Sequence, residues 1–449
     1  MLNLLLFVLI SRQFGPAGVG TYSYGFAVAT FAFVIGCLGI EEYGIRQYAR
    51  MEPETQAGFL AELLGTQLVM VAAAVAALAV YLTITAPIPQ KLAIVLELTC
   101  YQVAAAAAVS FFIPEMAYQR MAYPALAEFA ARVVACTVAG ISIYVLHTSL
   151  AVALVGFPLA AAVWMYLAIR SARARGPLRF IVSRTAVERI ARIIWSFALI
   201  EIFVQLFARA GVIVLSLAVS DAAAGIFATG LRLIETALVP LGFFGIAFYP
   251  QLSRSFAAEI HTFRRSAMQM VWVMLLAGML VAWGLYFVAP SLLVPVFGER
   301  FAGTAPIMRL MAGLALVQAL EVGLGRVLLS ADLQVPRALF IAVGAVASVA
   351  LNAVLAPRFG VNGAIVSTVM AYGIINVLSL LALKRVLTGA ALLPLIWTLV
   401  LGVAVGAVVL AVLPSTGSGP VLQALGCAAI LIVVAGVAYL YRFGTREAA

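Results

Sequence analysis

Long apolar stretches fill almost the whole chain, and only glycine, proline and clusters of charge interrupt them. An α-helix needs about 20 apolar residues to cross the hydrocarbon core of a bilayer. A membrane β-barrel would instead show short segments of alternating polarity. The pattern therefore predicts an all-α integral membrane protein with about 14 spans. These spans cover residues 2–14, 20–40, 60–83, 88–112, 125–146, 150–170, 193–219, 225–248, 266–288, 305–328, 338–356, 363–383, 391–413 and 421–441.

Composition supports the membrane class. Of the 449 residues, 65% are hydrophobic and only 10% are charged. A soluble domain carries roughly a quarter charged residues because water must hydrate its surface.

The first predicted span is short, reaching about 20 Å against a hydrocarbon core of roughly 30 Å. We therefore expect the natural N-terminus to lie upstream of Met1.

Catalytic and metal-binding signatures are missing from the sequence. The four cysteines and two histidines lack the spacing of a metal or disulfide site. The sequence contains no Walker-type nucleotide loop, no H-E-x-x-H and no G-x-S-x-G. It therefore predicts a protein that is not an enzyme and needs no cofactor. Without a nucleotide site, any transport would have to be driven by an ion gradient, the membrane potential or the substrate gradient.

Basic residues predict how the chain is oriented. With the N-terminus inside, 18 of the 27 lysines and arginines fall on the cytoplasmic side, four fall outside and five lie within spans. Cytoplasmic loops carry such an excess, so both termini are predicted to be cytoplasmic. The formal net charge of +10 then reflects topology, and we expect bilayer lipid rather than nucleic acid as a partner.

Two weak internal matches predict a repeat of six spans. Residues 20–25 match 225–230, and residues 124–126 match 336–339, at similar offsets. Six is an even number, so the two halves share one orientation, as in transporters built from parallel repeats. The predicted domains are an N-lobe at 1–170, a basic cytoplasmic connector at 171–192, a C-lobe at 193–385, and two extra helices with a short tail at 386–449.

Charged side chains inside the spans mark the candidate site, because a charge at mid-bilayer costs about 2.5–3.5 kcal/mol on insertion scales. The candidate substrate-binding residues are Arg132, Arg209, Arg232, Arg309, Arg326 and Gln205. The candidate coupling residues or counter-charges are Glu97, Glu201, Glu235 and Glu321. Two purely structural explanations for these arginines stay open. Arg132 and Arg232 each have a glutamate one turn away that can neutralise them, and Arg309 and Arg326 are near enough to span ends to snorkel.

The excess of arginine over carboxylate favours an anionic passenger. Guanidinium presents a planar fork of donors that matches phosphate oxygens and does not deprotonate. A cavity lined by these arginines would suit a phosphate or diphosphate group. A cationic drug would instead favour carboxylates and aromatic rings.

Several stretches resemble the polysaccharide-biosynthesis flippases of the multidrug/oligosaccharidyl-lipid/polysaccharide (MOP) exporter superfamily. The resemblance begins at residues 12–22, continues from Arg209 to Leu252, and returns at 297–310 and 352–364. It implies two six-helix lobes around a central cavity, plus two C-terminal helices, in the bacterial inner membrane. It also implies alternating access and the movement of an undecaprenyl-diphosphate-linked oligosaccharide to the outer leaflet for surface polysaccharide synthesis. A polysaccharide polymerase or export machinery is the implied protein partner.

The sequence differs from that family in two features, and two other functions remain as alternatives. Many relatives have an acidic residue just after the seventh-span arginine, where this chain has Gly211, and the first span is short. The first rival is a cation-coupled exporter of small molecules or drugs from the same superfamily. The second is an integral-membrane glycosyltransferase or polysaccharide polymerase, although the longest predicted outer loop, residues 289–304, is small.

Overall fold

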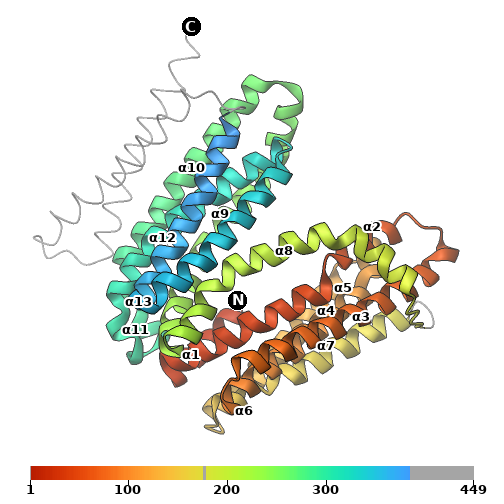
Figure 1. Ribbon diagram of the computed structural model, residues 1–449, viewed down its shortest axis with the longest axis horizontal. Helices are drawn as coiled ribbons and strands as arrows, with labels where there is room; N and C mark the ends of the chain where they lie inside the picture. Colours follow the sequence, from red (N-terminus) through yellow and green to blue (C-terminus); the bar gives the residue numbers. More distant parts are fainter. Residues whose placement is uncertain (1, 175–177, 385–449) are drawn as a thin grey trace, which may run out of the picture. The chain divides into compact units, whose positions relative to one another are not determined.

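The computed structural model describes residues 2–174 and 178–384, apart from the side chains of residues 196 and 197, and they form helices and loops without a β-strand (Figure 1). The chain divides into two compact units, with the first ending at Gly225 and the second beginning at Ile226. The predicted spans 391–413 and 421–441, and the predicted segment 386–449, lie outside the described residues. The predicted lobes, residues 1–170 and 193–385, were defined by the sequence repeat, whereas the two compact units are defined by packing. The lobe boundaries therefore remain a prediction.

The first unit is built around helix α4. Its helices are α1 (Leu2–Cys37), α2 (Ile40–Tyr48), α3 (Pro53–Thr85), α4 (Pro89–Ala117), α5 (Ala122–Tyr144), α6 (Leu150–Leu154), α7 (Gly156–Arg173) and α8 (Arg184–Ala218). Helix α4 packs against α1 and α7, and α8 packs against α1. Alanines such as Ala105, Ala106 and Ala108 are buried on α4, and these small side chains let neighbouring helices approach closely.

The second unit contains the remainder of α9 and further helical segments. Helix α9 (Asp221–Ala258) passes from the first unit into the second, and is followed by α10 (Ile260–Phe287), α11 (Ala289–Phe297), the 3₁₀ helix η1 (Glu299–Thr304), α12 (Ala305–Ser330) and α13 (Gln334–Leu383). Helix α12 packs against both α10 and α13. The core of the second unit is rich in buried methionine, including Met268, Met270 and Met274. These flexible side chains fill irregular gaps between helices.

Ten helices in the described part of the chain are long and apolar enough to cross a membrane. Two of them contain a sharp bend at a glycine, Gly15 in α1 (φ 64°, ψ −163°) and Gly360 in α13 (φ 59°, ψ −136°). Each bend lies between two predicted spans, so α1 and α13 together account for four spans. The structure therefore agrees with the predicted all-α fold of about 14 spans over the residues it describes.

The basic connector between α7 and α8 lies against α3. The Ile181 backbone N–H donates to the Ala61 carbonyl oxygen at 3.0 Å, and Arg189 pairs with Glu62. Gly65 makes this approach possible, because a Cβ there would collide with the Ile181 carbonyl. The segment from Leu178 to Ser183 therefore packs on α3 through its own backbone.

Candidate functional site

A cavity of about 270 Å³ lies within the first unit and is lined by five helices, α1, α4, α5, α7 and α8. Its polar lining residues are Asn3, Thr30, Gln102, Glu128, Arg132, Gln205 and Arg209. Three of the six predicted substrate-binding residues, Arg132, Gln205 and Arg209, therefore share one cavity. The lining holds two arginines and one glutamate, which gives a formal charge of +1.

Each charged group of this cavity is held by a neighbour. Arg132 and Glu128 form an ion pair one turn apart on α5, with both side chains about 40% exposed. The Arg209 guanidinium carbon lies 5.6 Å from the centre of the Phe26 ring on α1. An arginine over an aromatic face is attracted by the ring's quadrupole, so this contact orients a guanidinium without neutralising it.

Three of the predicted site residues, Glu201, Gln205 and Arg209, follow one another at intervals of four residues on α8. The Gln205 side-chain amide donates to a carboxylate oxygen of Glu201 at 2.7 Å. Gln205 and Arg209 line the cavity one turn apart, whereas Glu201 is exposed and is not part of the cavity wall. Two of the three residues therefore line one cavity, and their role in binding a substrate remains a prediction.

Aromatic rings form the rest of the cavity wall. They are Tyr22, Phe26, Phe33, Tyr101, Phe157 and Trp164. Ring centres lie 6.3 Å apart for Tyr22 and Phe157, 5.3 Å for Phe157 and Tyr101, and 5.6 Å for Tyr101 and Trp164. These separations are those of favourable aromatic pairs. The rings form a continuous chain from α1 across α7 and α4, so the cavity has a rigid apolar face beside its arginines.

The other predicted arginines belong to the second unit, and each has its own contact there. Arg232 lies 3.4 Å from Glu235 on the same helix. The Arg309 guanidinium lies over the Tyr286 ring at 5.8 Å, and its side chain is exposed. Arg326 lies against Gly245 of α9. Their assignment to a substrate site remains a prediction.

Two predicted carboxylates have contrasting surroundings. Glu321 accepts a hydrogen bond from Arg337 at 3.1 Å, across the α12–α13 contact. Arg337 reaches it by lying over Gly325, where a Cβ would come within 2.8 Å of the guanidinium. Glu97 is half-buried on α4, and one of its carboxylate oxygens lacks a hydrogen-bond partner among the described residues.

Sequence reasoning missed two sets of residues. The aromatic wall is spread over three helices, and no spacing rule separates these rings from ordinary packing residues. The second set surrounds Lys91, which the sequence analysis counted only as one of the four basic residues on the outer side. The structure places it in the first turn of α4, 8% exposed and paired with Asp221, which follows it by 130 residues. Two residues so far apart give no local signal.

Comparisons with known proteins match the fold and not the sequence. No protein-family model and no curated protein sequence matches the chain. Among solved structures, the lipid II flippase MurJ in an inward closed conformation matches with a TM-score of 0.76 and 12% identity, over 98% of this chain and 96% of that chain. An inward-facing multidrug resistance MATE family transporter matches with a TM-score of 0.67 and 11% identity, over 86% and 94%. The eukaryotic MATE transporter AtDTX14 matches at 0.52 and 12%, over 85% and 90%.

These likenesses, together with the long apolar helices, define a multi-pass membrane protein with a transporter fold. More particularly, the chain shares its fold with the lipid II flippase and with the MATE transporters, of which one is described as a member of the MOP superfamily. The predicted all-α fold class is confirmed, and the resemblance seen in the sequence is confirmed as a likeness in fold. All three of these neighbours are transporters or flippases.

Proposed function

We propose that this protein is a flippase for an undecaprenyl-diphosphate-linked oligosaccharide. It would carry the headgroup from the cytoplasmic to the outer leaflet by alternating access, for the synthesis of surface polysaccharide. It acts in the bacterial inner membrane with both termini in the cytoplasm, and it hands its product to a polysaccharide polymerase or export machinery.

The observation that carries this proposal is the net positive, arginine-bearing cavity of the first unit. Arg209 lines this cavity, and its guanidinium carbon lies 5.6 Å from the centre of the Phe26 ring. A diphosphate offers several oxygens that can accept from Arg132 and Arg209 as charge-assisted hydrogen bonds. The fold supports the same reading, since one neighbour is described as a lipid II flippase.

The size of the cavity fits part of such a molecule. Sites that bury a whole drug-sized ligand measure about 300–1,000 Å³, and this cavity measures about 270 Å³. A phosphate group with one sugar ring is a passenger of suitable size, while the polyprenyl tail stays in lipid. The aromatic wall beside the arginines offers flat apolar faces to the carbon–hydrogen face of a sugar ring.

A flipping assay tests the proposal. Proteoliposomes containing the purified protein and a fluorescent undecaprenyl-diphosphate-linked oligosaccharide are treated with a membrane-impermeant quencher, and the protected fraction is followed over time. The wild type should equilibrate the two leaflets faster than protein-free vesicles. Arg209→Ala should insert normally and lose most of that rate, whereas Arg254→Ala, an exposed arginine of α9, should keep it. Equal rates for Arg209→Ala and wild type would refute the site, and no flipping by the wild type would refute the function.

A cation-coupled exporter of small molecules is the second candidate, favoured by the aromatic lining and by the MATE neighbours. Aromatic faces attract flat organic cations as well as sugars. A dye-efflux assay in a sensitive strain separates the candidates. Export of a cationic dye that depends on Glu128, the carboxylate in the cavity wall, would favour this candidate over the flippase.

A further inference from the structure

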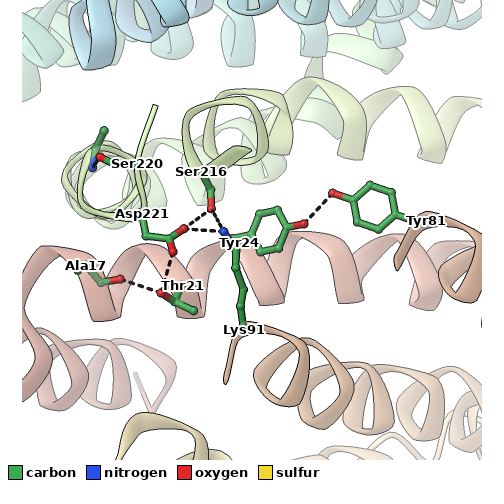
Figure 2. A network of polar contacts seen from close by, with 9 residues as sticks. Ala17, Thr21, Tyr24, Tyr81, Lys91, Ser216, Ser220 and Asp221 are labelled. Carbon is green, nitrogen blue, oxygen red and sulfur yellow. Dashed lines mark hydrogen bonds and ion pairs between the residues drawn. The ribbon is translucent and has the colours of Figure 1, made fainter. Parts of the chain in front are cut away.

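A second polar cluster lies in the first unit at the end that the charge pattern predicts to face outside (Figure 2). The Lys91 ammonium nitrogen is 2.7 Å from a carboxylate oxygen of Asp221 and 2.7 Å from the Ser216 hydroxyl oxygen. The Lys91 side chain is 10% exposed and that of Asp221 is 26% exposed. Lysine is almost never buried unless it is paired, so this pair holds both groups in place.

One aromatic ring lies against the ammonium group, and a second tyrosine holds that ring. The nitrogen lies 4.1 Å from the centre of the Tyr24 ring, and the Tyr24 hydroxyl lies 2.9 Å from the Tyr81 hydroxyl. Figure 2 shows Lys91 ending between Tyr24 on one side and the Ser216–Asp221 pair on the other. Tyr24 is fully buried, so the ring face is a fixed part of the lysine site. The cluster thus joins α1, α3 and α4 to the end of α8 and the start of α9.

Asp221 is held from two sides. One of its oxygens is bonded to both Lys91 and Ser216, and the other lies 3.3 Å from the Thr21 hydroxyl oxygen. Asp221 is also the first residue of α9, where the helix dipole favours a negative charge. The carboxylate therefore fastens the first turn of α9 to α1 and α4 more firmly than a single surface ion pair would.

The Lys91–Asp221 pair matters because helix α9 belongs to both compact units. It starts in the first unit at Asp221 and continues as part of the second unit after Gly225. In a transporter that works by alternating access, the outer ends of the helices must separate before a passenger can leave toward the outside. The start of α9 can leave α1 only if the Lys91–Asp221 pair opens.

We propose that Lys91 and Asp221 form an outer latch, a gating ion pair that must open in every transport cycle and that sets how often the outer side is open. Ser216, Thr21 and Tyr24 position the two charges. The proposal rests on the proposed transport function, but not on which passenger is carried. It assigns these residues a role separate from the arginine-bearing cavity, because the residues that line that cavity include neither Lys91 nor Asp221.

Cysteine accessibility tests the latch without any passenger. Gln102, which lines the cavity on α4, is replaced by cysteine in a chain whose four native cysteines are serine. A membrane-impermeant maleimide is added from the predicted outer side, and the labelling rate is measured. Asp221→Asn and Lys91→Met should each raise this rate on the order of tenfold or more, because each leaves one buried partner without its counter-charge.

Two further variants separate gating from damage to the fold. The charge-reversed double variant, Lys91→Asp with Asp221→Lys, should bring the labelling rate back toward the wild-type value. Glu188→Gln, which removes a solvent-exposed ion pair with Arg184, should leave the rate unchanged. Each variant is first checked for a single symmetrical peak on size exclusion, so that a misfolded variant is not read as an open one.

The outcomes distinguish the latch from the proposed function. Unchanged labelling in Asp221→Asn and Lys91→Met would overturn the latch, even if the wild type flips lipid-linked oligosaccharide. Faster labelling in both, reversed by the charge swap, would support the latch even if the wild type flipped no such lipid.

Discussion

Gly20 of α1 and Gly225 of α9 pack backbone against backbone, and each lies over the carbonyl group four residues before the other. A Cβ on Gly20 would overlap the Asp221 carbonyl oxygen, and a Cβ on Gly225 would overlap that of Pro16. The relationship is reciprocal, and the two glycines occupy matching positions in the predicted repeat. The sequence match between residues 20–25 and 225–230 therefore includes a contact in which the two copies meet.

The first prediction follows from this contact. Gly20→Ala or Gly225→Ala should lower the free energy of unfolding by about 1–3 kcal/mol, because overpacked helices must shift apart. The measurement is thermal unfolding of the purified protein in detergent. Gly284→Ala is the matched control, since nothing lies within 4 Å of a Cβ there, and it should be neutral or slightly stabilising. Equal melting temperatures for Gly20→Ala, Gly225→Ala and Gly284→Ala would show that the close approach is not needed.

The second prediction concerns the one carboxylate in the cavity wall. Glu128→Gln raises the formal charge of the lining from +1 to +2 and frees Arg132 from its ion pair. The pair is partly exposed and of modest strength, so we expect flipping of the lipid-linked oligosaccharide to stay within about fivefold of wild type. Arg132→Ala, its matched partner variant, should be impaired. Loss of flipping in Glu128→Gln with retention in Arg132→Ala would contradict an anion-binding cavity.

The third prediction separates two roles left open for Glu321. If it serves as a counter-charge for Arg337, then Arg337→Met should cost about 1–3 kcal/mol by leaving a mostly buried carboxylate unpaired. Adding Glu321→Gln to that variant should recover most of the loss. A double-mutant cycle on thermal stability measures the coupling. Additive effects, with transport abolished by Glu321→Gln alone, would favour the coupling role instead.

The fourth prediction concerns the bend in α13. Gly360 has a backbone conformation that residues with a Cβ rarely adopt, and open space surrounds it. Gly360→Ala should therefore destabilise the protein by about 1–3 kcal/mol through backbone strain alone. Gly373→Ala, in the same helix and also in open space, should not. Thermal unfolding measures both variants. Unchanged stability in Gly360→Ala would show that the backbone conformation at residue 360 is not required.

Hydropathy and charge predicted the fold well because the bilayer imposes strict rules on the chain. Apolar length fixed the spans, and the glycines at 15 and 360 marked breaks within stretches that form two long helical elements. The boundary between compact units was harder to predict. It falls inside α9, where the sequence is as apolar as on either side, and packing decides it.

The candidate site was predicted only in part. Arg209 and Gln205 were found together because they share a helix face, and Arg132 because a charge within a span is unusual. Phe26, Tyr101 and Trp164 gave no such signal, since aromatic residues are ordinary in spans. Arg337 looked like a loop residue, and only the contact between α12 and α13 reveals its pairing with Glu321.

The packed connector has a practical meaning for anyone who modifies this protein. Residues 178–183 look in sequence like a tether, a natural place for an epitope or a fluorescent fusion. The Ile181 backbone N–H donates to the Ala61 carbonyl oxygen, and the Ile181 carbonyl lies close against Gly65. An insert there would therefore displace α3, the helix that carries Tyr81, the hydrogen-bond partner of Tyr24. A tag in this segment would therefore report on a perturbed protein.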